Sequence, residues 1–93
     1  MFMALVKLFG NLRRYGTVNQ VEVPGETVRQ VLHNICTEYE GLRNVVLAAD
    51  GGALRPFIRI TLNGHDIELL DGLDTAVTSQ DHIAIFPPIA GGN

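Results

Sequence analysis

Several features that mark large protein classes are scarce or absent in this sequence. A single cysteine, Cys36, excludes an internal disulfide and a multi-cysteine metal site. Apolar residues make up 46% of the chain, but they fall in short alternating runs, none of which is long enough to span a bilayer. Lys and Arg total 7 against 10 Asp and Glu, so the excess of positive charge typical of nucleic-acid binders is missing. The sequence therefore indicates a protein that binds neither membrane nor nucleic acid.

The length of the chain and its first residues indicate the number of domains and the location of the protein. A chain of 93 residues is large enough for one hydrophobic core and too small for a second. Residues 1–4 show no signal-peptide profile, so we expect a cytoplasmic protein. We expect one domain over residues 1–88 and a flexible tail over residues 89–93.

The first half of the chain predicts a hairpin and then a helix. Residues 4–9 have the pattern of a strand, and residues 20–23 alternate polar with apolar side chains as a half-buried partner strand does. Thr27 with Gln30 three positions later is the pattern of a capping box. The apolar residues that follow at helical spacing are Val28, Val31, Leu32, Ile35 and Tyr39.

Gly41 is expected to end this helix, and residues 42–46 could add a further short helical turn. Cys36 falls beside the apolar stripe, where we interpret it as a small, half-buried hydrophobic residue rather than a nucleophile. Gly51-Gly52 lacks the strand-to-helix context of a phosphate-binding loop and is interpreted as a flexible connection.

The second half of the chain predicts strands again. Residues 57–62 alternate, Asn63-Gly64 suits a tight turn that needs positive φ, and residues 67–69 are expected to pair back as a short strand. Residues 82–86 predict the last strand. One helix cannot cover both faces of such a sheet, so we predict an α+β fold in which a mixed four- to five-stranded sheet wraps around one main helix. The other face remains for solvent or a partner.

Other side chains that carry chemistry do not form a site in the sequence. The three histidines lie in different predicted elements without metal-ligand spacing, so surface or cap roles are favoured. The aspartates of the later loops have no paired base or nucleophile and are interpreted as turn and cap residues. These residues are His33, His65, His82, Asp71, Asp74 and Asp81. We therefore predict no metal, no bound cofactor and no autonomous enzyme.

The carboxyl-terminal segment points to chemistry on the terminus itself. Two successive glycines, Gly91 and Gly92, let the backbone enter a slot too narrow for a side chain. Pro87 and Pro88 hold the approach extended and remove two amide donors. A frayed end, which is common at termini, is the plainer interpretation of the Gly-Gly pair.

Several segments that follow one another along nearly the whole chain carry a family resemblance. They are Phe9-Gly10-Asn11-Leu12-Arg13, residues 23–28, Asn63-Gly64 with Asp66-Ile67, Gly72-Leu73-Asp74-Thr75 and Ile85-Phe86-Pro87-Pro88-Ile89-Ala90-Gly91-Gly92. In these motifs the sequence resembles the ubiquitin-like sulfur-carrier family, which includes the small subunit of molybdopterin synthase and the carriers for thiamin and for one route to cysteine.

This resemblance implies a β-grasp fold and a defined role for the tail. It implies that an ATP-dependent activating enzyme adenylates the terminal glycine, Gly92. It further implies that the adenylate becomes a thiocarboxylate, whose sulfur passes to an acceptor synthase. Tail presentation would then fall to residues 87–91, that is, to Pro87, Pro88, Ile89, Ala90 and Gly91.

Two positions depart from the family pattern. Ser79-Gln80-Asp81 replaces a common Asp-Gly-Asp turn, where we expect only Asp81 to be needed to cap the turn. Asn93 extends the chain beyond the second glycine, and a slot shaped for glycine should reject it. Some relatives lose such an extension to a metalloprotease, so the chain resembles a precursor. A degenerate copy that is never activated is the alternative.

Several functions remain open on the sequence. The chain could be a sulfur carrier, a ubiquitin-like modifier joined to lysines of other proteins, or an inert β-grasp interaction module. The sulfur acceptor could belong to molybdopterin, cysteine, thiamin or tRNA metabolism.

A docking surface is also expected beside the tail. If Ile83 and Ile85 face the helix, alternation places Phe86 on the opposite face of the sheet, where we expect Phe57 to join it across the sheet. Exposed aromatic side chains of this kind often anchor partners. The alternative is that Phe86 belongs to the core.

Overall fold

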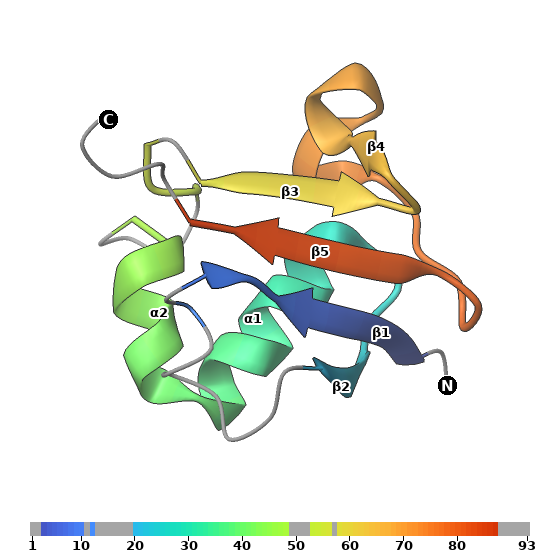
Figure 1. Ribbon diagram of the computed structural model, residues 1–93. Coiled ribbons are helices and arrows are strands. Elements are labelled where there is room, and N and C mark those ends of the chain that lie inside the picture. Colours follow the sequence, from blue (N-terminus) through green and yellow to red (C-terminus); the bar gives the residue numbers. More distant parts are fainter. Residues whose placement is uncertain (1–2, 11, 13–19, 49–52, 57, 88–93) are drawn as a thin grey trace.

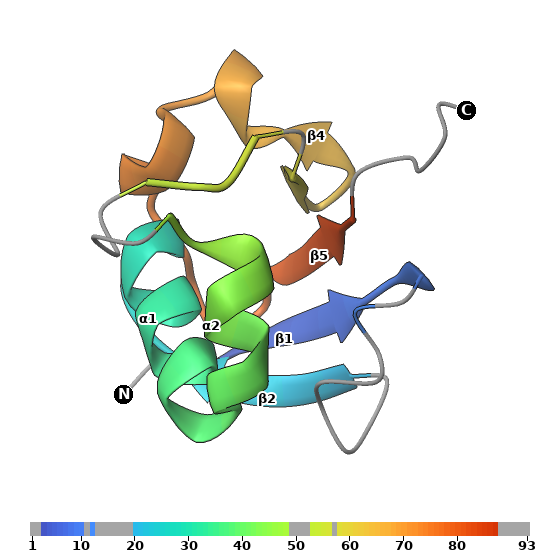
Figure 2. The same cartoon turned by 90° about the vertical axis from the view of Figure 1, so that its left-hand side faces the viewer.

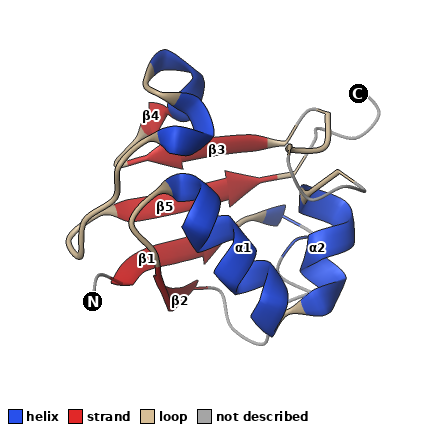
Figure 3. Ribbon diagram, turned by 180° about the vertical axis from the view of Figure 1, so that it is seen from behind, coloured by secondary structure: helices blue, strands red, loops and turns tan. Residues whose placement is uncertain are grey.

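The computed structural model describes residues 3–10, 12, 20–48, 53–56 and 58–87. They form a mixed five-stranded sheet in the order β2-β1-β5-β3-β4, in which β1 and β5 run parallel and the other neighbours antiparallel. Figures 1, 2 and 3 show both helices packed on one face of this sheet. The elements are β1 (Met3–Leu8), β2 (Gln20–Pro24), α1 (Val28–Glu38), α2 (Glu40–Val46), β3 (Arg59–Leu62), β4 (His65–Asp66), the 3₁₀ turns η2 (Ile67–Leu69) and η3 (Gly72–Asp74), and β5 (His82–Phe86).

Strand alternation builds the core as the sequence predicts. β1 and β2 pair as an antiparallel hairpin, and β5 lies beside β1 in the middle of the sheet. Ile83 and Ile85 point to the helix side and are 1% and 0% exposed. The core they join takes side chains from β1, β2, β3 and both helices, so one hydrophobic cluster supports the whole sheet.

The predicted capping box at the start of α1 is confirmed. The backbone N–H of Gln30 donates to Thr27 Oγ1 at 3.2 Å. Gln30 Oε1 reaches back and accepts from the backbone N–H of Glu26 at 2.8 Å, one residue before the cap. Both bonds satisfy amides at the amino-terminal side of the helix, where no preceding turn supplies acceptors.

The prediction that Gly41 ends the helix is wrong. α1 ends at Glu38, because Tyr39 leaves the helical region at φ −122° and ψ 87°, and Gly41 lies inside the following helix, α2. Leu42 and Val46 of α2 are both 0% exposed, so burial of this second helix against the core outweighs the cost of a glycine in its first turn. The further helical turn expected at residues 42–46 is therefore present and longer than predicted.

The Cys36 side chain is fully buried, whereas the sequence predicted a half-buried one. Its side chain is 1% exposed in the core cluster, and burial raises the pKa of its thiol to about 11, with Arg43 acting in the opposite direction. Since the thiolate is the nucleophilic form, this thiol is unreactive at neutral pH, in agreement with its interpretation as a hydrophobic residue.

The turn at Asn63-Gly64 forms as predicted, with φ of 52° and 89°, but the strand expected at residues 67–69 does not. β4 consists of His65 and Asp66 alone. Asp66 Oδ1 accepts from the backbone N–H of Glu68 at 2.9 Å and thereby starts the 3₁₀ turn η2. Ile67 is buried by this turn, whereas Leu69 is left outside at 81% exposure. At residues 67–69 the Asp66 side-chain cap therefore forms in place of the backbone hydrogen bonds that a strand would make.

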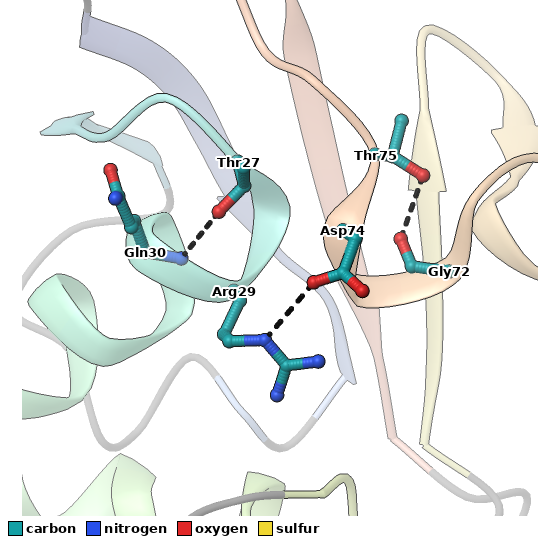
Figure 4. Close-up of polar contacts among 6 residues, drawn as sticks. All are labelled: Thr27, Arg29, Gln30, Gly72, Asp74 and Thr75. Carbon is teal, nitrogen blue, oxygen red and sulfur yellow. Dashed lines mark hydrogen bonds and ion pairs between the residues drawn. The ribbon is translucent and has the colours of Figure 1, made fainter.

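Hydrogen bonds and an ion pair connect the segment after η2, residues 72–75, to the start of α1 (Figure 4). The Val28 backbone N–H donates to the Thr75 carbonyl oxygen at 3.0 Å, and Arg29 Nε lies 3.3 Å from Asp74 Oδ1. Thr75, buried at 6% exposure, donates its hydroxyl to the Gly72 carbonyl oxygen at 2.7 Å. The long connection between β4 and β5 is thus ordered by backbone and side-chain contacts rather than by a strand.

Candidate functional site

The face of the sheet opposite the helices is open. Strand pairing sets Lys7, Ala84 and Thr61 in one row across β1, β5 and β3, and sets Arg59 beside Phe86. Ala84, Thr61 and Phe86 are half-buried, while Lys7 and Arg59 are exposed. A shallow depression of about 400 Å³ lies over this row and extends to Asn63, Gly64 and His82. The predicted uncovered face therefore exists, and it is shallow with polar margins.

Phe86 lies on this open face, at the last residue of β5. It is half-buried and outside the hydrophobic core, so the alternative that placed it in the core is wrong. Its ring stacks on that of Phe9, with centroids 4.6 Å apart and an angle of 17° between the planes. Phe57, expected to join it, lies outside the described residues.

Sequence analysis did not assign Phe9 to this site. Its backbone N–H donates to the Ile85 carbonyl oxygen at 3.1 Å, which carries the β1–β5 pairing one residue beyond β1. Phe9 follows Lys7 by two residues and so shares its face of the sheet. That alternation was visible in the sequence, but the parallel pairing that brings Phe9 to Phe86 was not.

Gly10 and Pro87 make the closest approach of the site. Gly10 has φ +60°, and a Cβ at this position would lie 2.7 Å from Pro87 Cγ and 3.3 Å from Pro87 Cδ. Only glycine combines this left-handed backbone with so short an approach. Phe9 and Gly10, the two residues after β1, therefore contact Phe86 and Pro87, where the chain leaves β5. The rest of the expected tail, residues 88–93, lies outside the described residues.

Asp81 fixes the other end of β5. Asn63 Nδ2 donates to its Oδ1 at 2.9 Å, and the Thr78 backbone N–H donates to its Oδ2 at 2.7 Å. These bonds, the one from Asn63 first, hold the pKa of the Asp81 carboxyl below its ordinary value. Asn63 Oδ1 also accepts from the His82 backbone N–H at 2.9 Å. Asp81 therefore caps this turn as predicted, and β5 is held at both ends.

The other aspartates and the histidines form no second site. Asp74 pairs with Arg29. Asp71 lies in a turn at the N-cap position of η3, as predicted, although its side chain makes no cap bond. Within the described residues no group of three or more His, Cys, Asp or Glu is placed to hold a metal ion. No helix in that part of the chain has both the length and the hydropathy to cross a membrane.

Comparison with known proteins assigns this architecture. Small archaeal modifier protein 3 of Haloferax volcanii is 36% identical over 66 residues, which cover 71% of this chain and 70% of that protein. The sulfur carrier protein CysO of Mycobacterium tuberculosis is 30% identical over 78 residues, covering 83% and 84%.

Solved structures agree with these sequence matches. The solution structure of small archaeal modifier protein 1 from Methanosarcina acetivorans matches with a TM-score of 0.89 at 34% identity, over 99% of this chain and 100% of that one. A chain of the Amycolatopsis orientalis BexX/CysO complex matches with a TM-score of 0.83 at 27% identity, over 96% and 99%. These matches confirm the predicted β-grasp fold.

A match to the sequence profile of the ThiS family covers residues 6–92, which is almost the whole chain and includes both tail glycines. Members of this family are carriers that supply no catalytic machinery of their own. The chain therefore belongs to the ThiS family of ubiquitin-like sulfur carriers and is not an enzyme.

Proposed function

We propose that this protein carries sulfur on Gly92 and delivers it to a biosynthetic enzyme. The observation that supports this most directly is the root of the tail. β5 ends at Phe86, and the next residue, Pro87, packs on Gly10. The chain that bears the Gly-Gly pair thus departs from a fixed point at the margin of the open face.

The chemistry proposed for the tail needs three reactants. The Gly92 carboxylate attacks the α-phosphorus of ATP in the activating enzyme, forming an acyl adenylate and releasing pyrophosphate. Sulfide-level sulfur, as hydrosulfide, then attacks the carbonyl carbon, displaces AMP and leaves a thiocarboxylate and a proton. Activation is needed because a carboxylate is a poor electrophile, and a glycyl end leaves the carbonyl carbon open to attack.

In this proposal the globular domain binds the partner, and the tail carries the reactive group into the partner's active site. From Ile89 to Gly92 an extended segment reaches roughly 13 Å at about 3.3 Å per residue, enough to enter a partner's active site. The globular domain would stay outside and supply the docking surface, with Phe86 as its aromatic anchor and Phe9 stacked beneath it. Phe57 is proposed as a further member. The BexX/CysO complex shows that one structural relative assembles with a second protein.

Asn93 gives this proposal a processing step. With Asn93 in place the carboxylate sits on a carbon that bears a side chain, which a slot shaped for glycine would exclude. We propose that a metalloprotease removes Asn93 before activation. The competing proposal, a degenerate copy that is never activated, predicts that neither form reacts.

Activation should be tested by mass spectrometry on two forms of the chain. The form that ends at Gly92, incubated with its activating enzyme, ATP and a sulfur donor, should gain the mass of an oxygen-to-sulfur exchange. The full-length form should stay unchanged until it is trimmed, and Gly92→Ala in the trimmed form should slow activation without altering stability. Absence of both adenylate and thiocarboxylate in the trimmed form would reject the carrier proposal. Equal reaction of both forms would reject the processing step.

A second function, conjugation to lysines of other proteins, is supported by the match to small archaeal modifier protein 3. Both fates share the same activation, so the test must follow the product. A tagged form ending at Gly92 and a matched form lacking Gly91 and Gly92 can be expressed in the native cell and immunoblotted. Tagged species of higher mass found only with the first form would show modification. The sulfur acceptor, whether in molybdopterin, cysteine, thiamin or tRNA synthesis, can be identified by supplying the thiocarboxylate to each candidate synthase.

A further inference from the structure

A second surface lies at the β4 edge of the sheet and includes none of the residues at the root of the tail. Leu69 and Leu70, at the end of η2, are 81% and 44% exposed. Their exposure follows from the fold, because the Asp66 cap turns the chain into η2 and sends Ile67 inward. In Figure 1 this segment projects from the sheet beyond β4, on the side away from α2. Two adjacent exposed leucines on a short ordered turn are unusual for a surface without a partner.

The net charge around these leucines is negative. From Ile60 to Asn93 the sequence contains no Lys or Arg, and its five acidic residues are Asp66, Glu68, Asp71, Asp74 and Asp81. Arg59 pairs with Asp66 at 3.5 Å and Arg29 with Asp74 at 3.3 Å.

Glu68 and Asp71 flank the leucine pair directly, and both are exposed. Neither side chain has an ion-pair partner within the part of the chain that the structure describes. The leucine pair is therefore bordered by uncompensated negative charge.

A groove of about 260 Å³ adjoins Glu68. Ile58, Ile60 and Ile67 lie at its base but are buried, and Leu54 is half-buried. Most of the accessible lining is polar, and Glu68 and the Arg59–Asp66 ion pair belong to it. A lysine or arginine side chain fits such a groove, because its cation can meet the Glu68 carboxylate there.

We propose that Glu68, Leu69, Leu70 and Asp71, together with this groove, form a docking surface for a partner protein that presents apolar side chains beside lysine or arginine. Charge complementarity selects this partner. A nucleic acid or an anionic membrane would be repelled, and a second copy of the chain would set like charges against each other. The inference does not depend on the tail, and it holds whichever chemistry the tail performs.

The proposal can be tested with a probe of the stated chemistry. The ¹⁵N-labelled protein is titrated with an amphipathic helical peptide of leucine and lysine, and in parallel with a peptide in which every lysine is replaced by glutamate. The lysine peptide should shift the amide signals of residues 66–71 and of Ile58 and Ile60, and it should bind at least about tenfold more tightly than its acidic counterpart. Shifts centred on Phe86 and Phe9, or equal binding of both peptides, would overturn the proposal.

Variants separate the apolar from the ionic contribution. Leu69→Ser should weaken the lysine peptide about tenfold, in the range of a modest hot spot, while Glu68→Gln should reduce the salt dependence of binding. Met3→Ser is the matched control, since Met3 is another exposed apolar side chain, 39% exposed, on β1. Both leucine and methionine changes fall on exposed side chains, so the amide spectrum should remain that of the folded protein. Equal effects of Leu69→Ser and Met3→Ser would overturn the proposal.

Discussion

The two faces of the same three strands differ in what they do. On the helix side, Val6, Ile60 and Ile85 are at most 1% exposed and pack into one core. On the open side, the residues next to them in sequence form a flat surface that ends at Phe86 and the root of the tail. Because side chains alternate along a strand, Ile85 can serve stability while Phe86 serves recognition. The comparison teaches that fold and site can be separated by single substitutions one residue apart.

The largest effect is expected on the helix side. Ile85→Ala removes a fully buried side chain and leaves a cavity in the core next to β1 and β3, the strands that flank β5. The free energy of unfolding should fall by about 2–5 kcal/mol, measured by chemical denaturation. A loss below about 1 kcal/mol would mean that this face is not the closely packed core described.

The open face should respond in binding rather than in stability. Phe86→Ser removes the ring that stacks on Phe9, and we expect binding to the activating enzyme to weaken by about 1–3 kcal/mol while the domain stays folded. Circular dichroism and calorimetric binding on the same preparation measure both properties.

Ile85→Val serves as the matched control for Phe86→Ser. It should cost about 0.5–1.5 kcal/mol of stability without changing the open face, so binding should be unaffected. If Phe86→Ser unfolds the protein, the Phe9–Phe86 stack is needed for the fold, and the separation of stability from recognition fails. If the folded variant binds with unchanged affinity, Phe86 is not part of the interface.

A smaller effect is expected at Gly10, which follows β1 and contacts Pro87 at the root of the tail. Gly10→Ala should lower the free energy of unfolding by about 1–2 kcal/mol through its left-handed backbone. It should also slow activation, because the new Cβ displaces Pro87 and redirects the tail.

Gly72→Ala provides the control for Gly10. Gly72 has φ +61°, nearly the value at Gly10, but a Cβ there would meet nothing within 4 Å. It should therefore lose less stability than Gly10→Ala, whose new Cβ also displaces Pro87, and it should activate at the normal rate. Equal activation of the two variants would show that the Gly10–Pro87 contact does not direct the tail.

Much of the fold follows from local sequence patterns, and much of the site does not. The hairpin, the capping box and the inward side of β5 depend on alternation, helical spacing and caps within a few residues. The strand predicted at residues 67–69 is absent because the cap by Asp66, a single side-chain bond, overrides the alternation. The helix end predicted at Gly41 is wrong because tertiary burial of α2 outweighs the preference of glycine.

The contacts at the root of the tail join opposite ends of the chain. Phe9 meets Phe86, and Gly10 meets Pro87, only because β1 and β5 pair in parallel in the middle of the sheet. No local pattern encodes that register. The sequence could therefore predict that Phe86 lies outside the core, but it could not predict that Phe86 stacks on Phe9.

The smallest effect is expected for the tail itself, and it tests whether residues beyond Pro87 belong to the domain. Deleting Gly91 to Asn93 should leave the melting temperature nearly unchanged, because a solvated terminal segment buries little apolar surface. A truncation after Phe86 is the comparison, since it also removes Pro87 from its contact with Gly10 and should lower the melting temperature measurably. A large drop from the shorter deletion would mean that the glycines pack on their own domain. They could not then enter the active site of another protein, and the division between a docking body and a reactive arm would fail.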